Sequence, residues 1–311
     1  MIVSASRRTD IPAFFMPWLV GRLREGFALV RNPYNPHRVS HIPLTPDVLD
    51  AMVLWTKNPL PMLPHLDALR DVPYYIQFTL TPYGRDIERN LPDKAALLGG
   101  FSELSRQIGP ERLVWRYDPL LFNAKWTPDV HLAAFTRMAE RLSGCTETST
   151  VSILDHYRRM EKACAPLGLH TPAPEVLSEL LARMAEIAAQ HGMRLTTCAE
   201  DPALLPPGVF PARCIDPVRL EKLVGVPLSL PRDANQRPAC GCARSVDIGC
   251  YNTCSNGCLY CYANWSDASI QRQRARYDPD SPLLCGQLTD EDIVTEGAFS
   301  SDKLLQTSLF D

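Results

Sequence analysis

Short β-rich runs alternate with helical patterns along this 311-residue chain, and this alternation limits its fold more than any other feature. The runs predicted to be strands lie at 2–6, 52–56, 75–80, 113–117, 150–154 and 194–198. Apolar residues at three- and four-residue spacing predict helices at 95–107, 128–142 and 174–191. Strands that alternate with helices form βα units and a mostly parallel sheet. The sequence therefore predicts an α/β fold, a complete or partial TIM-like barrel of parallel strands, with a seventh strand at 245–249.

The chain changes character after about residue 224. A proline-rich irregular stretch leads into six cysteines between positions 240 and 261, and a helix-like segment follows at 267–276. Two β-rich runs at 27–31 and 39–44 predict an inserted hairpin. We therefore expect three consecutive regions: a (βα)n barrel-like domain over 1–230, a cysteine-rich iron–sulfur element over 231–285, and a flexible C-terminal tail over 286–311.

The composition narrows the classes of function. The net charge of −3 argues against a protein that coats nucleic acid electrostatically, and no apolar run is long enough to span a membrane. The first residues lack the pattern of a signal peptide, so we expect a cytoplasmic protein. Eleven cysteines in a reducing compartment indicate metal or redox chemistry rather than disulfides.

Polar residues collect where the predicted strands end, which is the edge at which parallel barrels build their active sites. Arg8, Lys57, Arg116 and Asp118 are the candidates that we expect to contact a ligand there. The alternative is that such residues cap helices or pair with one another, for example Arg8 with Asp10.

Cys254, Cys258 and Cys261 form a C-x3-C-x2-C motif, with Tyr260 just before the last thiol. A structural zinc site takes four protein ligands, whereas a cubane iron–sulfur cluster held by three cysteines leaves one iron open. The motif thus favours a [4Fe–4S] cluster with one open iron. The alternative is a fourth ligand, such as Cys250, that closes a structural zinc or electron-transfer site.

This motif resembles the cluster motif of radical S-adenosylmethionine (SAM) enzymes, and in particular spore photoproduct lyase-like proteins. The resemblance implies that SAM binds the open iron and that an electron donor starts its cleavage to a 5′-deoxyadenosyl radical. These enzymes carry the motif after their first strand, whereas about 250 residues precede it here. Because a barrel is closed, a first strand moved to 245–249 would leave the site unchanged.

Four further cysteines suggest a second metal site. Cys240 and Cys242 form a C-x-C pair, Cys198 ends a predicted strand, and Cys214 lies in a proline-rich loop. Together they would provide four thiolates for an auxiliary iron–sulfur cluster or for zinc.

Most of the chain also resembles a cysteine-rich prokaryotic family known only as a domain of unknown function. The matching stretches are SASRRTDIP, LVRNPYNP, VLWTKNP, QFTLTPYG, VWRYDP and SVDIGCYNTCSNGCLYCYAN. This resemblance implies an iron–sulfur protein and supplies no reaction. A non-catalytic iron–sulfur or zinc protein for electron transfer or protein interaction is the alternative to a radical enzyme. A metal-dependent hydrolase is disfavoured because the seven histidines are scattered.

The last residues suggest a partner. Gln306, Ser308, Leu309 and Phe310 resemble the Q-x-S-L-F peptide with which bacterial DNA polymerases and repair proteins bind the sliding clamp. Two adjacent apolar anchors and a glutamine suit docking into a pocket. We therefore expect residues 306–310 to bind the clamp, which would make DNA the substrate and DNA repair the process.

Overall fold

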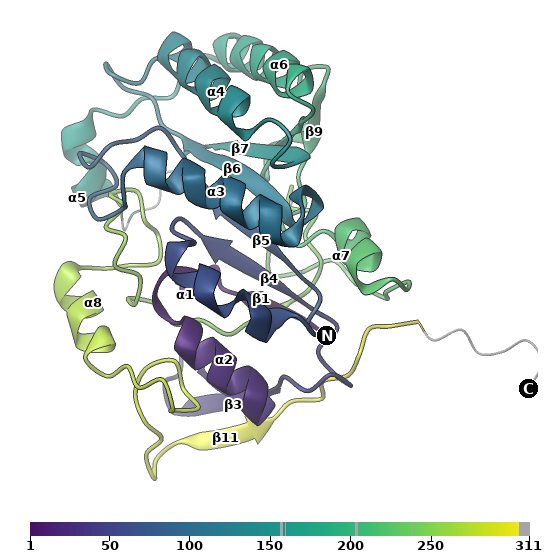
Figure 1. The fold of residues 1–311 in the computed structure, drawn as a ribbon. Coiled ribbons are helices and arrows are strands. Elements are labelled where there is room, and N and C mark those ends of the chain that lie inside the picture. The colour runs from purple at the N-terminus through teal and green to yellow at the C-terminus, as the bar shows by residue number, and fades with distance from the viewer. Residues whose placement is uncertain (156–157, 159, 203–204, 238, 305–311) are drawn as a thin grey trace, which may run out of the picture.

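A single sheet of parallel strands organises the protein (Figure 1). The computed structural model describes residues 1–155, 158, 160–202, 205–237 and 239–304. Within those ranges the sheet has eight strands in the order β10-β1-β4-β5-β6-β7-β8-β9, and every pairing is parallel. The strands are β1 (Ile2–Ala5), β4 (Ala51–Thr56), β5 (Tyr74–Thr79), β6 (Leu113–Leu120), β7 (Thr148–Ile153), β8 (Arg194–Thr197), β9 (Val209–Pro211) and β10 (Val246–Asp247). The predicted parallel α/β fold is confirmed.

The strand order follows the chain from β1 to β9, interrupted only by the inserted hairpin. Helical segments make the connections: α1 (Ile11–Phe14), α2 (Met16–Glu25), η1 (Leu60–Leu69), α3 (Lys94–Ile108), η2 (Pro110–Arg112), α4 (Pro128–Leu142), α5 (Glu161–Cys164), η3 (Ala165–Leu167) and α6 (Pro174–Gln190). Figure 1 shows α2, α3, α4 and α6 arranged along one side of the sheet. The 3₁₀ helix η1 was not predicted, because Pro61 in its first turn and Pro64 inside it disrupt the α-helical pattern.

Alternating side chains give the sheet two different faces. Val3, Ile76 and Trp115 belong to the main core, together with buried residues of α1 to α4 and α6. Tyr75 and Val114 point the other way and belong to a second core, together with α7 (Pro217–Val224) and three of the cysteines. The helices therefore cover one face, and the C-terminal part of the chain covers the other.

The segment after α7 joins the two edges of the sheet. The preceding strand, β9, lies at one edge, and β10 pairs with β1 at the opposite edge, with Val3 beside Val246 and Ser4 beside Asp247. Although β10 has only two residues, the Asp247 carboxylate also accepts hydrogen bonds from Ser6 Oγ at 2.6 Å and from the Arg7 N–H at 2.8 Å. The strand predicted at 245–249 is thus present and lies next to the first strand.

The end of the described chain packs against the inserted hairpin. β2 (Phe27–Arg31) and β3 (Arg38–Pro43) pair antiparallel, as predicted, and β11 (Ile293–Glu296) adds a third strand beside β3. The sequence predicts a tail over 286–311, but part of it is held in this small sheet, where Arg31 pairs with Asp292. Residues 306–310, which carry the predicted clamp-binding peptide, lie outside the described residues. In the described part of the chain, no helix combines the length and the apolar character that crossing a membrane would need.

Candidate metal centre at two groups of cysteines

The loop that follows β10 carries Cys254, Cys258 and Cys261, here called the triad. It lies across the segment after β5, where Glu88 forms a β-bridge with Cys258. Backbone N–H groups point at two of the sulfurs: that of Asn256 at Cys254, and those of Ala263 and Asn264 at Cys261. Such N–H···S bonds are a common feature of cysteine ligands, because they stabilise thiolates and tune bound clusters.

Burial raises the pKa of all three triad thiols. The charge of Asp10 and those of Cys261 and Cys258 raise the pKa of Cys254 further. A buried thiolate therefore needs a cation to stabilise it, and a bound metal supplies one.

Glu88 is the centre of a buried polar network beside the triad. Its carboxylate is fully buried and accepts hydrogen bonds from Lys57 Nζ at 2.8 Å, Lys94 Nζ at 2.6 Å and Thr81 Oγ1 at 2.9 Å. Tyr260 donates its hydroxyl to the same carboxylate and accepts from Lys57 Nζ at 2.8 Å. Two predicted site residues, Lys57 and Tyr260, are thus held together by a third that the sequence did not single out.

Neighbouring groups determine the protonation states of Glu88 and Lys57 in this network. Burial alone would raise the pKa of Glu88, but the two lysines lower it to about 2. Burial lowers the pKa of Lys57, yet the negative charge of Glu88, and that of Cys258 when it is a thiolate, raise it above its ordinary value. Lys57 therefore keeps a positive charge next to the triad.

Asp10 positions the triad loop from the other side. It caps α1 and accepts hydrogen bonds from the Lys57 N–H at 2.8 Å and from Asn256 Nδ2 at 2.9 Å. Because Asn256 lies between Cys254 and Cys258, this carboxylate connects the ends of β1 and β4 to the motif. The signal for this role in the sequence is limited to the position of Asp10 after a predicted strand.

Cys250 has different surroundings. Its Sγ donates to the carbonyl of Tyr251 at 3.5 Å, and burial raises its pKa while Arg8 and two other arginines lower it. The thiol that it influences electrostatically is Cys285, whose pKa is raised mainly by burial. Cys250 packs against the main core, whereas Cys258 and Tyr260 pack in a separate cluster.

Four other cysteines, here called the tetrad, form a chain of contacts: Cys198, Cys214, Cys240 and Cys242. The sulfurs of Cys198 and Cys214 are 3.3 Å apart, and the Cys214 thiol also contacts that of Cys242. A hydrogen bond from Cys242 lowers the pKa of Cys240 to about 7. The Cys242 sulfur accepts the backbone N–H of Cys214 at 3.2 Å. Cysteines more than 40 positions apart in the sequence thus contact one another on the face of the sheet opposite the connecting helices.

Arg116 and Asp118 lie beside the tetrad. Arg116 is almost fully buried, pairs with Asp118 at 2.6 Å and donates from Nη1 to the sulfur of Cys214 at 3.0 Å. Asp118 also accepts the hydroxyl of Ser152. The charge of Asp118 contributes to the raised pKa of both Lys57 and Cys198, so it acts on both groups of cysteines.

Arg8 lies at the end of β1, near β10. Its Nε is 3.8 Å from the Asp247 carboxylate, and its guanidinium lies 5.5 Å from the centre of the Tyr251 ring. The alternative pairing of Arg8 with Asp10 is not formed, because other groups occupy the Asp10 oxygens. The four predicted rim residues are therefore distributed: Lys57 beside the triad, Arg116 and Asp118 beside the tetrad, and Arg8 at the edge.

The donor chemistry of both groups suits a soft metal, since thiolates select zinc and iron–sulfur clusters. Among the residues that the structure describes, no three His, Cys, Asp or Glu side chains are already arranged to hold a metal ion. The support for metal binding is therefore that each group contains several buried thiols that accept N–H···S hydrogen bonds. It is not that the described side chains already have the geometry of a metal site.

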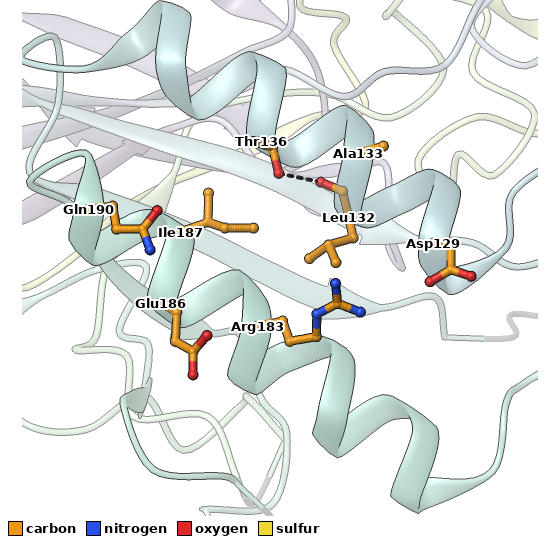
Figure 2. A pocket seen from close by; sticks show the side chains of 8 residues that line it. All are labelled: Asp129, Leu132, Ala133, Thr136, Arg183, Glu186, Ile187 and Gln190. Carbon is orange, nitrogen blue, oxygen red and sulfur yellow. Dashed lines mark hydrogen bonds between the residues drawn. The ribbon is translucent and has the colours of Figure 1, made fainter.

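A surface hollow of about 460 Å³ lies elsewhere, between α4 and α6 (Figure 2). Its lining residues are Asp129, Leu132, Ala133, Thr136, Arg183, Glu186, Ile187 and Gln190. None of them is a cysteine or a predicted site residue, so this hollow offers no chemistry related to the two cysteine groups.

The protein is an α/β protein with a parallel sheet. Buried thiols and charged side chains lie on the face of the sheet opposite the connecting helices and in the loop after β10. The chain belongs to the family described as a domain of unknown function, DUF1848, whose model matches residues 2–263. The match begins at β1 and ends two residues after Cys261, so it includes both cysteine groups. No curated protein matches the chain.

Proposed function

We propose that the protein is a radical SAM-type iron–sulfur enzyme in which the triad holds a [4Fe–4S] cluster. The observation that carries this proposal is the position of the triad. It follows β10 directly, and β10 is the parallel neighbour of β1 at the edge of a sheet whose strands follow the chain order. If β10 is counted as the first strand, the motif stands where radical SAM enzymes carry theirs.

The topology supports a barrel-like sheet rather than a doubly wound one. A doubly wound sheet reverses its strand order at a switch point and carries helices on both faces. Here the order does not reverse, and α1 to α4 and α6 pack into one core on one face. We therefore propose that the sheet is a complete or partial TIM-like barrel, with the open face as its interior.

A cluster on three cysteines fits the surroundings of Cys250. A closed four-cysteine site would need a fourth thiol near the triad, but Cys250 packs against the main core and influences Cys285. Both oxygens of Asp10 and of Glu88 accept hydrogen bonds already. One iron would therefore remain open to a non-protein ligand.

The cluster, when bound with SAM, would supply reductive cleavage to a 5′-deoxyadenosyl radical, with electrons from an external donor. The chain's own residues bind and orient. The Lys57 ammonium would hold negative charge beside the triad, and Tyr260 would fix it there through the shared hydrogen bond with Glu88. Tyr83 packs edge-on against both Tyr260 and Trp126, which excludes water from this side.

The interior face would position the substrate. Arg116 and Asp118 lie on it, with Trp55, whose Nε1 donates to Ser4 Oγ at 3.1 Å. The Arg116 guanidinium lies 5.6 Å from the centre of the Trp55 ring. Charged groups beside an aromatic side chain suit a polar substrate. The C-terminal peptide makes DNA the substrate class that we propose, on sequence grounds alone.

Anaerobic reconstitution tests the proposal. We expect about four irons and four sulfides at the triad, an EPR signal of the reduced protein that changes when SAM is added, and release of 5′-deoxyadenosine under strong reductant. Replacing Cys254, Cys258 and Cys261 together by alanine should remove this iron, whereas Cys250→Ala should retain it. Loss of iron in Cys250→Ala would show a closed site and contradict the enzyme. Full iron in the triple variant would refute the cluster assignment.

A further inference from the structure

We infer that the tetrad binds one tetrahedral zinc ion, separate from the triad, and that this ion fixes the crossing segment over the open face of the sheet. The crossing segment comprises the described residues 225–237 and 239–245. The inference does not depend on the radical chemistry proposed above. It rests on the spacing of the sulfurs, on the groups around them and on the path of the chain.

The sulfur spacing favours a single ion over a cubane cluster. Two sulfurs on one zinc, with bonds of about 2.3 Å at a tetrahedral angle, stand about 3.8 Å apart. The sulfurs of Cys198 and Cys214 are 3.3 Å apart, so they need to separate only slightly. The cysteine ligands of a cubane bind different irons and stand much farther apart, which would require Cys198 and Cys214 to move well away from each other.

Arginines and backbone N–H groups surround the thiols and suit the negative charge of a tetrathiolate site. Binding of Zn²⁺ by four thiols releases four protons and leaves a net charge of −2. Arg116 donates to the Cys214 sulfur at 3.0 Å, and the N–H groups of Cys214 and Ile215 point at the Cys242 sulfur. Such second-shell donors hold the ligands and compensate their charge.

Gly241 allows a further arginine to approach the tetrad. A Cβ built at Gly241 would stand 3.2 Å from Cγ and 3.3 Å from Nε of Arg213. The absence of a side chain between Cys240 and Cys242 therefore lets Arg213 pack closely against the C-x-C turn.

The tetrad joins two parts of the chain that the sheet alone leaves apart. Cys198 follows β8, Cys214 lies between β9 and α7, and the C-x-C pair lies in the crossing segment before β10. The Cys214 carbonyl is also held from the sheet, by Tyr75 at 2.6 Å and Gln77 at 3.0 Å. A zinc ion here would connect the β8–β9 edge of the sheet to the segment that leads to β10.

Metal analysis of the full-length protein, purified anaerobically, tests the inference. We expect about one zinc per chain in the parent and in the triad alanine variant. The zinc content should fall at least tenfold in the double variants Cys198→Ser/Cys214→Ser and Cys240→Ser/Cys242→Ser. Cys145→Ser is the matched control and should keep it, because Cys145 contacts Ser102 and lies outside both groups.

A second measurement uses the unmutated protein, in case a double variant does not fold. Alkylation followed by mass spectrometry should show the four tetrad thiols protected together, and a zinc chelator should expose them together. Zinc that stays in both double variants, or protection that the chelator does not change, would overturn the inference. Iron and sulfide that disappear with the tetrad cysteines would show a cluster and also overturn it.

Discussion

The Glu88 carboxylate is predicted to contribute about 3 kcal/mol to the stability of the protein at neutral pH. Its pKa falls from an ordinary 4.5 to about 2, because two lysines outweigh the effect of burial. Each pKa unit corresponds to about 1.4 kcal/mol, so this difference corresponds to about 3 kcal/mol. Solvent screening does not reduce the value much, since the carboxylate is fully buried.

Glu88→Gln tests this value because glutamine has the shape of the protonated acid and lacks the charge. At pH 7 we expect the free energy of unfolding in urea to fall by about 3 kcal/mol, within the range for breaking a buried ion pair. A depressed carboxyl pKa stabilises the folded state above pH 4.5, and this stabilisation is lost as the pH falls from 4.5 towards 2. The difference in unfolding free energy between the parent and Glu88→Gln should therefore decrease as the pH falls from 4.5 towards 2.

The assay is urea unfolding of both proteins at pH 7, 5 and 3, followed by circular dichroism. Both proteins are compared in their metal-free form, because Glu88 lies beside the triad and acid loss of metal would affect the two proteins differently. Glu103→Gln is the control, since Arg106 and Gln107 lower the pKa of Glu103 to about 2, but on an exposed helix surface. Exposed pairs contribute little, so this variant should unfold like the parent. Equal stability of parent and Glu88→Gln at pH 7, or a constant difference down to pH 3, would refute the reasoning.

Three further predictions concern other parts of the molecule. Arg116→Ala should lower the free energy of unfolding in urea by about 3 kcal/mol, because it leaves its carboxylate partner without a cation; a loss below about 1 kcal/mol would show that water compensates it. Phe101→Ala should cost about 3–5 kcal/mol in the same assay, since this buried ring stacks on Phe78 at 5.0 Å; a much smaller cost would mean that the core collapses around the gap. Leu309→Ala and Phe310→Ala should abolish binding to the host's sliding clamp in a pull-down or calorimetric assay, whereas equal binding by the variants would exclude the peptide as the anchor.

The sequence predicted the sheet well because its strands depend on local pattern. Each buried parallel strand is a short apolar run, and its ends fall within a few residues of the prediction. β9 was missed because it has three residues, two of them exposed, and one of these is a proline. β11 was missed because all four of its residues are exposed and it forms only by pairing with a distant hairpin.

The candidate cysteine ligands of the site could be predicted from the sequence, but the contacts that position them could not. Cysteine spacing identifies the triad and the C-x-C pair, since these signals are local. That Lys57 meets Tyr260, or that Asp10 holds Asn256, depends on contacts between residues about 200 or more positions apart. Glu88 gave no signal, because an acidic residue in a loop after a strand resembles many exposed ones. Burial between two lysines is a property of the folded chain alone.

The two cysteine groups are coupled through the shortest strand of the sheet. The C-x-C pair ends four residues before β10 begins at Val246, and the triad starts seven residues after β10 ends at Asp247. Two residues of pairing hold a strand weakly, so β10 needs support from elsewhere. Asp247 supplies part of it through Ser6 and the Arg7 N–H. The crossing segment adds Ser245 and Asp233, which lie 3.1 Å and 3.7 Å from the Arg7 guanidinium. A metal at the tetrad would therefore fix the approach to β10, and with it the position of the triad relative to Lys57.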